Sequence, residues 1–149
     1  MSAHARTVLV VEDNPTDVML IRRAFIKANI GNPLQVVHDG DEAVQYLAGE
    51  GIFADRTGYP LPAVMLLDLK LPRRSGLEVL QWVRGRTALR RLPVVVLTSS
   101  NQSQDVNRAY DLGANSYLVK PVEFDELKDM LGKVNVYWIA LNKKPSLSM

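Results

Sequence analysis

Two kinds of segment alternate along this chain, and their alternation restricts the folds that it can adopt. Five short runs rich in Val and Leu are each followed by a longer stretch with helical spacing of apolar residues. At least the first, third and fourth runs are apolar at successive positions, as expected for strands covered by helices on both faces. This alternation predicts an α/β, doubly wound fold with a five-stranded parallel sheet and right-handed crossovers. The runs cover residues 7–12, 34–38, 63–67, 93–98 and 116–119.

The stretches between the runs carry signals for helix boundaries. Asn14 before Pro15 is typical of an N-cap followed by proline at the first helical position. Asp39 precedes a second helix that is expected to stop at Gly49. Residues 49–62 contain three Gly and two Pro, which indicates a surface loop. Leu77, Leu80 and Val83, each three residues apart, mark the third helix. Val106 and Ala109, three residues apart, and the adjacent Tyr110 mark the fourth.

The last helix is predicted to extend beyond the compact domain. One apolar stripe continues through about five turns, a spacing that places its members on one helix face. We therefore expect a domain at residues 6–132 and an extension of the last helix at residues 133–149, ending in a frayed tail. The stripe consists of Phe124, Leu127, Leu131, Val134, Trp138 and Leu141.

Composition excludes several classes of protein. The 149 residues are enough to bury a core in one domain, and the absence of cysteine excludes disulfides, thiolate metal sites and cysteine nucleophiles. The formal charge is only +2 and the basic residues occur in pairs, so we expect no binding to nucleic acid. We find no signal peptide and no apolar run of ~18 residues, which predicts a cytoplasmic protein without a membrane span.

Polar side chains follow four of the predicted strands. The first strand ends in Glu12 and Asp13, the third in Asp68 and the fourth in Thr98, while Lys120 follows the fifth. Because ligands of open α/β sheets bind beyond the carboxyl ends of the strands, these five groups are expected to meet at one edge. Each alone is also compatible with a turn or cap residue, but five complementary groups on one edge favour a site.

The charges of these groups predict the chemistry of that site. Carboxylates held close together repel each other, which raises the pKa of at least one unless a cation is present. Lys120 supplies one positive charge, and an all-oxygen ligand set favours Mg²⁺ as a second cation. An ionised Asp68 can then attack phosphorus and form an aspartyl phosphate.

The same residues lie in motifs that resemble the response-regulator receiver family, over roughly residues 6–132. The resemblance implies a flavodoxin-like strand order of 2-1-3-4-5, one of the common orders of doubly wound sheets. It also implies a phosphoprotein of a two-component system. The motifs are "VVEDN" (10–14), "LLDLKLP" (66–72), "SG" (75–76), "VVVLTSS" (94–100) and "GANSYLVKP" (113–121).

The resemblance implies a role for each site residue. Asp68 is the expected phosphoacceptor, and a sensor histidine kinase is the expected donor. Asp13 and Asp68 would bind Mg²⁺ directly, with the main-chain carbonyl of Lys70, while Glu12 would act mainly through water. Thr98 and Lys120 would each contact a phosphoryl oxygen.

Further positions are also implied by the family. Tyr117 would turn inward when Thr98 is recruited to the phosphoryl group, and the Lys120–Pro121 peptide would be cis. Ser100, like Lys70, would influence the lifetime of the phosphoryl group. From the residues alone, Thr98 could instead cap the following helix, and Tyr117 could simply pack between strand and helix.

The C-terminal residues suggest how a signal is passed on. Since little sequence follows the predicted domain, output is expected through another protein or through self-association, at the surface of the fourth helix, fifth strand and fifth helix. We expect a homodimer involving Tyr137, Trp138 and Leu141, although these side chains could also fold back on their own domain. The aromatic extension and the 49–62 loop resemble regulators of bacterial, often cyanobacterial, phytochromes, which implies a phytochrome as the kinase.

Two other functions share parts of this pattern. A phosphatase of the haloacid-dehalogenase type also uses a strand-end Asp with Mg²⁺, but it requires a second acid where Lys70 stands. A receiver-like adaptor that is never phosphorylated would have the same fold and would fail to bind Mg²⁺. Glycine-rich nucleotide-binding motifs do not follow the first strand. We therefore expect a phosphoacceptor signalling protein and not an enzyme.

Overall fold

The computed structural model describes residues 6–147, so residues 1–5 and the last two residues of the predicted tail lie outside it. Each strand lies within a run that the sequence predicted. The strands are β1 (Val8–Val11), β2 (Leu34–Val37), β3 (Val64–Leu67), β4 (Val94–Thr98) and β5 (Ser116–Val119). The α-helices are α1 (Pro15–Lys27), α2 (Gly40–Ala48), α3 (Gly76–Gly85), α4 (Ser103–Asp111) and α5 (Phe124–Val134).

The strands form one parallel sheet in the order β2-β1-β3-β4-β5, which confirms the predicted fold. The chain adds β2 on one side of β1 and β3 on the other, so the strand order reverses at β1. Val11 pairs with Leu67 in the register of β1 and β3. The residues that follow this pair, Glu12 and Asp68, therefore leave the sheet side by side.

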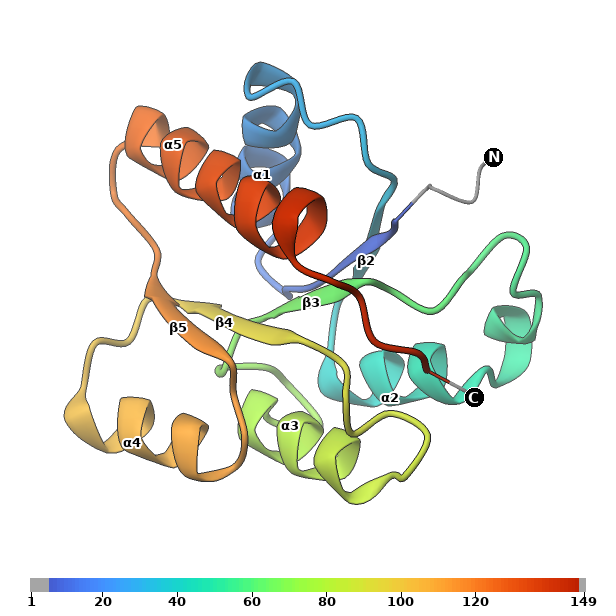
Figure 1. Ribbon diagram of the computed structural model, residues 1–149. Helices are drawn as coiled ribbons and strands as arrows, with labels where there is room; N and C mark the ends of the chain where they lie inside the picture. Colours follow the sequence, from blue (N-terminus) through green and yellow to red (C-terminus); the bar gives the residue numbers. More distant parts are fainter. Residues whose placement is uncertain (1–5, 148–149) are drawn as a thin grey trace.

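Helices cover both faces of the sheet. Helices α1 and α5 lie on one face, and α2, α3 and α4 lie on the other (Figure 1). Every residue of β1, β3 and β4 is buried, as their continuous apolar character predicted. In α4 only Ala109 is buried, whereas Tyr110, one of the apolar residues that mark this helix in the sequence, is exposed. None of the helices within residues 6–147 is both long and apolar enough to cross a membrane.

The loop at residues 49–62 packs more closely than a plain surface loop. It contains one turn of 3-10 helix, η2 (Gly51–Ala54), and buries Phe53 against Tyr46 of α2. Arg56 donates hydrogen bonds to the carbonyl oxygens of Tyr46 and Leu47 at 2.7 and 2.8 Å. The N–H of the C-cap residue Gly49 also donates to the Tyr46 carbonyl, so the cap and a loop side chain together complete the C-terminal end of α2.

The predicted extension of the last helix is present but is not a regular α-helix. Helix α5 continues directly into a π-helix, η3 (Asn135–Leu141), in which the N–H of Asn142 donates to the carbonyl of Tyr137. Hydrogen bonds five residues apart make the turns wider and change which residues face the core. Ile139 is therefore buried with 5% exposure, whereas Leu141 is 71% exposed. The prediction that Leu141 continues the buried stripe was wrong.

The residues after η3 do not extend freely into solvent, in contrast to the predicted frayed tail. Arg6, just before β1, donates hydrogen bonds to the carbonyl oxygens of Ile139 and Asn142. Leu147 then packs against the core on the side of α2 and α3. The C-terminal segment thus passes from one face of the sheet to the other (Figure 1).

The change of register in η3 gives a direct prediction. We expect Ile139→Ala to lower the free energy of unfolding by about 3 kcal/mol, because it leaves a cavity in the core. The matched variant Leu141→Ala should change it by less than about 0.5 kcal/mol, since that side chain is exposed. Urea unfolding of the two variants measures both values. Equal losses, or a larger loss for Leu141→Ala, would mean that a regular α-helical stripe is the correct description.

Candidate functional site

All five strand-end groups line one cavity of about 200 Å³ at the carboxyl edge of the sheet. Glu12 and Asp13 follow β1, Asp68 follows β3, Thr98 ends β4 and Lys120 follows β5. Parallel strands bring these positions together although they span more than one hundred residues of sequence. The remaining lining residues are Asn14, Asp17, Lys70 and Ser99.

The Asp68 carboxylate is buried and has a defined partner at each oxygen. Its Oδ1 accepts a hydrogen bond from Thr98 Oγ1 at 2.8 Å and from the Lys70 N–H at 3.2 Å. Its Oδ2 accepts from Lys120 Nζ at 3.0 Å. Helix α4 begins beyond Thr98, at Ser103, without a side-chain cap. Thr98 therefore bonds to Asp68 and does not cap the helix.

The Lys120 ammonium group is bound by three carboxylates. Nζ donates to Glu12 Oε1, to Asp17 Oδ2 at 2.9 Å and to Asp68 Oδ2 at 3.0 Å. Asp17 was not among the residues expected from the sequence. Its position gave one usable signal, since it lies in the first turn of α1, the helix that follows β1 at this same edge.

Burial and pairing shift the pKa values of these groups in different directions. Burial raises the pKa of Glu12 to about 7, because hydrogen bonds from Lys120 and the Asn14 N–H offset only part of the loss of solvent. Burial would also raise the pKa of Asp68, but Lys120 and Thr98 hold it below its ordinary value. For Lys120, burial alone would lower the pKa, and its hydrogen bonds to the three carboxylates raise it instead. The site therefore keeps Asp68 ionised.

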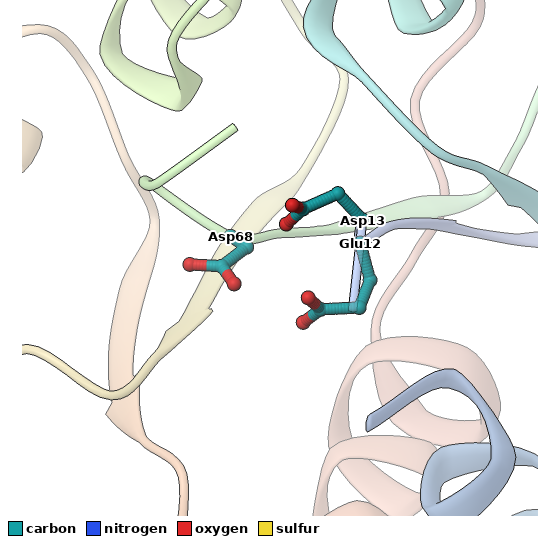
Figure 2. Close-up of side chains that lie close together, drawn as sticks. All are labelled: Glu12, Asp13 and Asp68. Atoms are coloured by element: carbon teal, nitrogen blue, oxygen red, sulfur yellow. The ribbon is translucent and has the colours of Figure 1, made fainter. Parts of the chain in front are cut away.

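Three of the acids form a group that fits a divalent metal ion. Among the described residues, Glu12, Asp13 and Asp68 each offer an oxygen, and these atoms lie within 4.8 Å of one another. Figure 2 shows the three side chains close together at the ends of β1 and β3. Both Glu12 oxygens accept hydrogen bonds, from Lys120 and from the Asn14 N–H, whereas Asp13 is exposed. Hard oxygen donors of this kind suit Mg²⁺, Mn²⁺ or Ca²⁺.

The loop after Asp68 is held by the start of α3. The Gly76 N–H donates to the carbonyl of Leu69 at 2.9 Å. A Cβ at residue 76 would lie 2.1 Å from the Asp68 carbonyl oxygen, so only glycine allows this approach. Ser75 and Glu78 form a capping box that begins the helix at this point. The "SG" pair thereby fixes the backbone on which Asp68 and Lys70 stand.

Tyr117 of β5 connects the site to α4. Its hydroxyl donates to the carbonyl of Ser100 at 2.9 Å, and its ring packs partly buried against the core. Ser100 Oγ in turn donates to Asp105 in the first turn of α4. Tyr117 therefore both packs and makes a specific hydrogen bond to the loop between β4 and α4.

The expectation of a cis peptide between Lys120 and Pro121 was wrong, because this peptide bond is trans in the structure. A trans X–Pro bond is favoured by about 0.5–1 kcal/mol unless the surroundings select the cis form. Lys120 reaches its three carboxylates with the trans peptide, so these contacts do not select cis.

Comparison with known proteins identifies the family. A family model described as "Response regulator receiver domain" matches residues 8–132. The chain therefore belongs to the response regulator receiver domain family, whose members are signalling proteins of two-component systems.

Particular relatives cover nearly the whole chain. "Probable methanogenesis regulatory protein FilR2" of Methanothrix harundinacea (strain 6Ac) is 40% identical over 138 residues, which cover 93% of this chain and 86% of that protein. "Response regulator Rcp1" of Synechocystis sp. (strain ATCC 27184 / PCC 6803 / Kazusa) is 34% identical over 134 residues, or 90% of this chain and 89% of that protein.

Solved structures agree with this placement. The bacteriophytochrome response regulator AtBRR is 48% identical, with a TM-score of 0.74 over 93% of this chain and 98% of the other. The Mn²⁺-bound form of response regulator Rcp1 is 33% identical and has a TM-score of 0.84, covering 95% of this chain and 99% of the other.

The shared ammonium group predicts how stability depends on pH. Lys120→Met should lower the free energy of unfolding by about 3 kcal/mol at pH 8, because it leaves buried carboxylates unpaired. The variant's folded state should take up a proton at Glu12, whose pKa already rises from 4.5 to about 7 in the intact protein. Since the folded state then binds more protons than the unfolded state, stability falls as pH rises through this window.

Urea unfolding at pH 5.5 and pH 8 measures this loss, which should be smaller at the lower pH. The control Lys128→Met removes a half-buried lysine whose ion pair with the exposed Asp129 is as long as 3.9 Å, and should change stability by less than about 0.5 kcal/mol at either pH. An equal loss for Lys120→Met at both pH values would contradict the prediction.

Proposed function

We propose that this protein accepts a phosphoryl group on Asp68 from the phosphohistidine of a sensor kinase. The observation that carries this proposal is the ionised, buried Asp68 carboxylate, which lies between Lys120 and Thr98 beside two further acids. An oxygen nucleophile with cations close to the transferring group is the arrangement that phosphoryl transfer requires.

The transfer forms a bond between an Asp68 oxygen and phosphorus and breaks the bond between phosphorus and the donor nitrogen. The imidazole leaves with the bonding electrons. Lys120 would donate a hydrogen bond to one phosphoryl oxygen and Thr98 to another. Mg²⁺, held by Asp13, Asp68 and the Lys70 carbonyl with Glu12 acting through water, would neutralise charge on the phosphoryl oxygens. Hydrolysis removes the phosphoryl group: water attacks phosphorus, the Asp68 carboxylate is the leaving group, and inorganic phosphate is released.

Phosphorylation would reach the surface through Thr98 and Tyr117. Thr98 contacts Asp68, and Tyr117 bonds to Ser100 in the loop that leads to α4. A phosphoryl group that attracts the Thr98 hydroxyl more strongly would therefore bias the position of this loop. The signal would pass to partners through the face formed by α4, β5 and α5.

A phytochrome is the kinase that the comparisons favour. AtBRR is named as a bacteriophytochrome response regulator and is 48% identical to this chain. The name of FilR2 instead refers to methanogenesis. We infer that the donor is the phosphohistidine of a phytochrome-type sensor kinase, and that phosphotransfer to this protein takes place in the cytoplasm.

Neither rival function is favoured by the site. Lys70 occupies the position where a haloacid-dehalogenase-type phosphatase needs a second acid, and its N–H donates to Asp68. A receiver-like adaptor without phosphorylation would not require the three metal-binding oxygens within 4.8 Å of one another.

Asp68→Asn should abolish the incorporation of acid-labile phosphate from acetyl phosphate and Mg²⁺, because the amide is not a nucleophile at phosphorus. The control Asp41→Asn, an exposed acid paired with Arg74, should be labelled like the unaltered protein. A panel of purified phosphorylated kinases that includes a bacteriophytochrome tests the donor under the same conditions. Unchanged labelling of Asp68→Asn would show that Asp68 is not the phosphoacceptor. If another class of kinase transferred its phosphoryl group fastest, the proposed phytochrome donor would be wrong.

We also propose that the C-terminal extension forms a homodimer. Tyr137 and Leu141 are exposed, and Trp138 and Met130 line a mostly apolar groove of about 510 Å³ formed by β5, α5 and η3, with charged residues of α5 also among its lining. Exposed apolar groups beside such a groove suit a self-complementary interface about a two-fold axis. Tyr137, Trp138 and Leu141 would form the centre of this interface.

The dimer predicts a selective effect of charge on this surface. Leu141→Glu should lower the molar mass in solution from that of a dimer to that of a monomer, because it places a charge in an apolar contact. Ile52→Glu, at a residue of similar exposure on η2, should leave the dimer intact. Light scattering with and without beryllium fluoride measures the mass. A monomer before any substitution, under both conditions, would rule out the dimer.

A further inference from the structure

Asp17 makes a contact that the proposed phosphoryl transfer does not use. Its Oδ2 accepts a hydrogen bond from Lys120 Nζ at 2.9 Å, from the first turn of α1. We propose that Asp17 competes with the phosphoryl group for Lys120 and thereby weakens the binding of a phosphoryl group at Asp68. This role rests on the proposed function of Asp68 as phosphoacceptor.

The donors of Lys120 are fully used in the structure. A lysine ammonium group has three N–H donors and no acceptor. Its three partners are the oxygens of Glu12, Asp17 and Asp68. A phosphoryl oxygen would be a fourth acceptor, so it obtains a hydrogen bond from Lys120 only if one of the carboxylates releases its own.

The carboxylates differ in how easily they can be released. The side chains of Glu12 and Asp68 are only 2% and 9% exposed, whereas that of Asp17 is 32% exposed. A buried carboxylate that loses its partner keeps a large desolvation cost, while a partly exposed one regains water. Phosphorylation converts the Asp68 carboxylate into an acyl phosphate, so Glu12 and Asp17 are the partners of Lys120 that remain carboxylates. Of these two, Asp17 is the one that Lys120 gives up first.

Charge acts in the same direction. A phosphoryl group on Asp68 replaces one negative charge by about two. Asp17 and Asp68 share the same ammonium group, so the added charge arises close to the Asp17 carboxylate. Repulsion between them disfavours the phosphorylated state as long as Asp17 is charged.

The test is the variant Asp17→Asn, titrated with beryllium fluoride, a phosphoryl mimic, by calorimetry at saturating Mg²⁺. The amide oxygen can still accept a hydrogen bond from Lys120, so the change removes charge with little change of shape. Affinity should rise by about five- to tenfold, the effect of one partly exposed charge at contact distance. The acid-labile phosphate formed from acetyl phosphate should also persist longer.

Two further variants control for other effects of the substitution. Asp41→Asn removes a charge from the first turn of α2, which follows β2 at the same edge, but Asp41 pairs with Arg74 and not with Lys120. Its affinity should stay within about twofold of the unaltered protein, as expected for a screened surface charge. Asp17→Ser should reproduce the gain of Asp17→Asn, and thermal melting verifies that both variants are folded.

The outcomes separate this role from the proposed function. If the unaltered protein binds beryllium fluoride and Asp17→Asn binds it equally or more weakly, Asp17 is not a competitor. In that case a phosphoryl oxygen replaces Asp68 Oδ2 as the acceptor of a Lys120 hydrogen bond, or Asp17 positions Lys120 for binding. If the unaltered protein binds none in the presence of Mg²⁺, Asp68 is not a phosphoacceptor site, and the role of Asp17 is overturned with it.

Discussion

The site depends on the ion pairs that the ammonium group of Lys120 forms with three carboxylates. This group joins the segment after β5 to Glu12 after β1, to Asp17 on α1 and to Asp68 after β3. Without this positive charge, buried carboxylates would face each other at low dielectric, and at least one would become protonated. One cation thus keeps Asp68 ionised and at the same time connects elements from both ends of the chain.

The backbone around Asp68 explains why its side chain can be both buried and reactive. Parallel register places Glu12 beside Asp68, and Gly76 lets the start of α3 approach the Asp68 carbonyl closely. Thr98 completes the shell from β4, and Tyr117 bonds to the loop that follows Thr98. The backbone near Asp68 is therefore closely packed on the side of α3. On the side of α4, a change of charge at Asp68 acts on a loop held by hydrogen bonds.

The C-terminal segment contributes to the fold in a way that differs from the receiver core. The π-helical turns bury Ile139 and expose Leu141, and Arg6 holds the end of these turns through main-chain carbonyls. Leu147 then packs against the core on the opposite face of the sheet, which α2 and α3 cover. This segment therefore stabilises its own domain and also presents apolar side chains outward.

The sequence by itself determined the strands, their order through the family resemblance, and the edge at which the polar groups meet, because residue periodicity and strand-end positions are local properties. It also identified Asp68, Thr98 and Lys120 as neighbours. Only the tertiary structure decided that Asp17 shares Lys120, that the Lys120–Pro121 peptide is trans and that Leu141 points away from the core. These features depend on distances between separate elements and on the hydrogen bonds that widen a helix. Such distances and hydrogen bonds cannot be deduced from the order of residues along the chain.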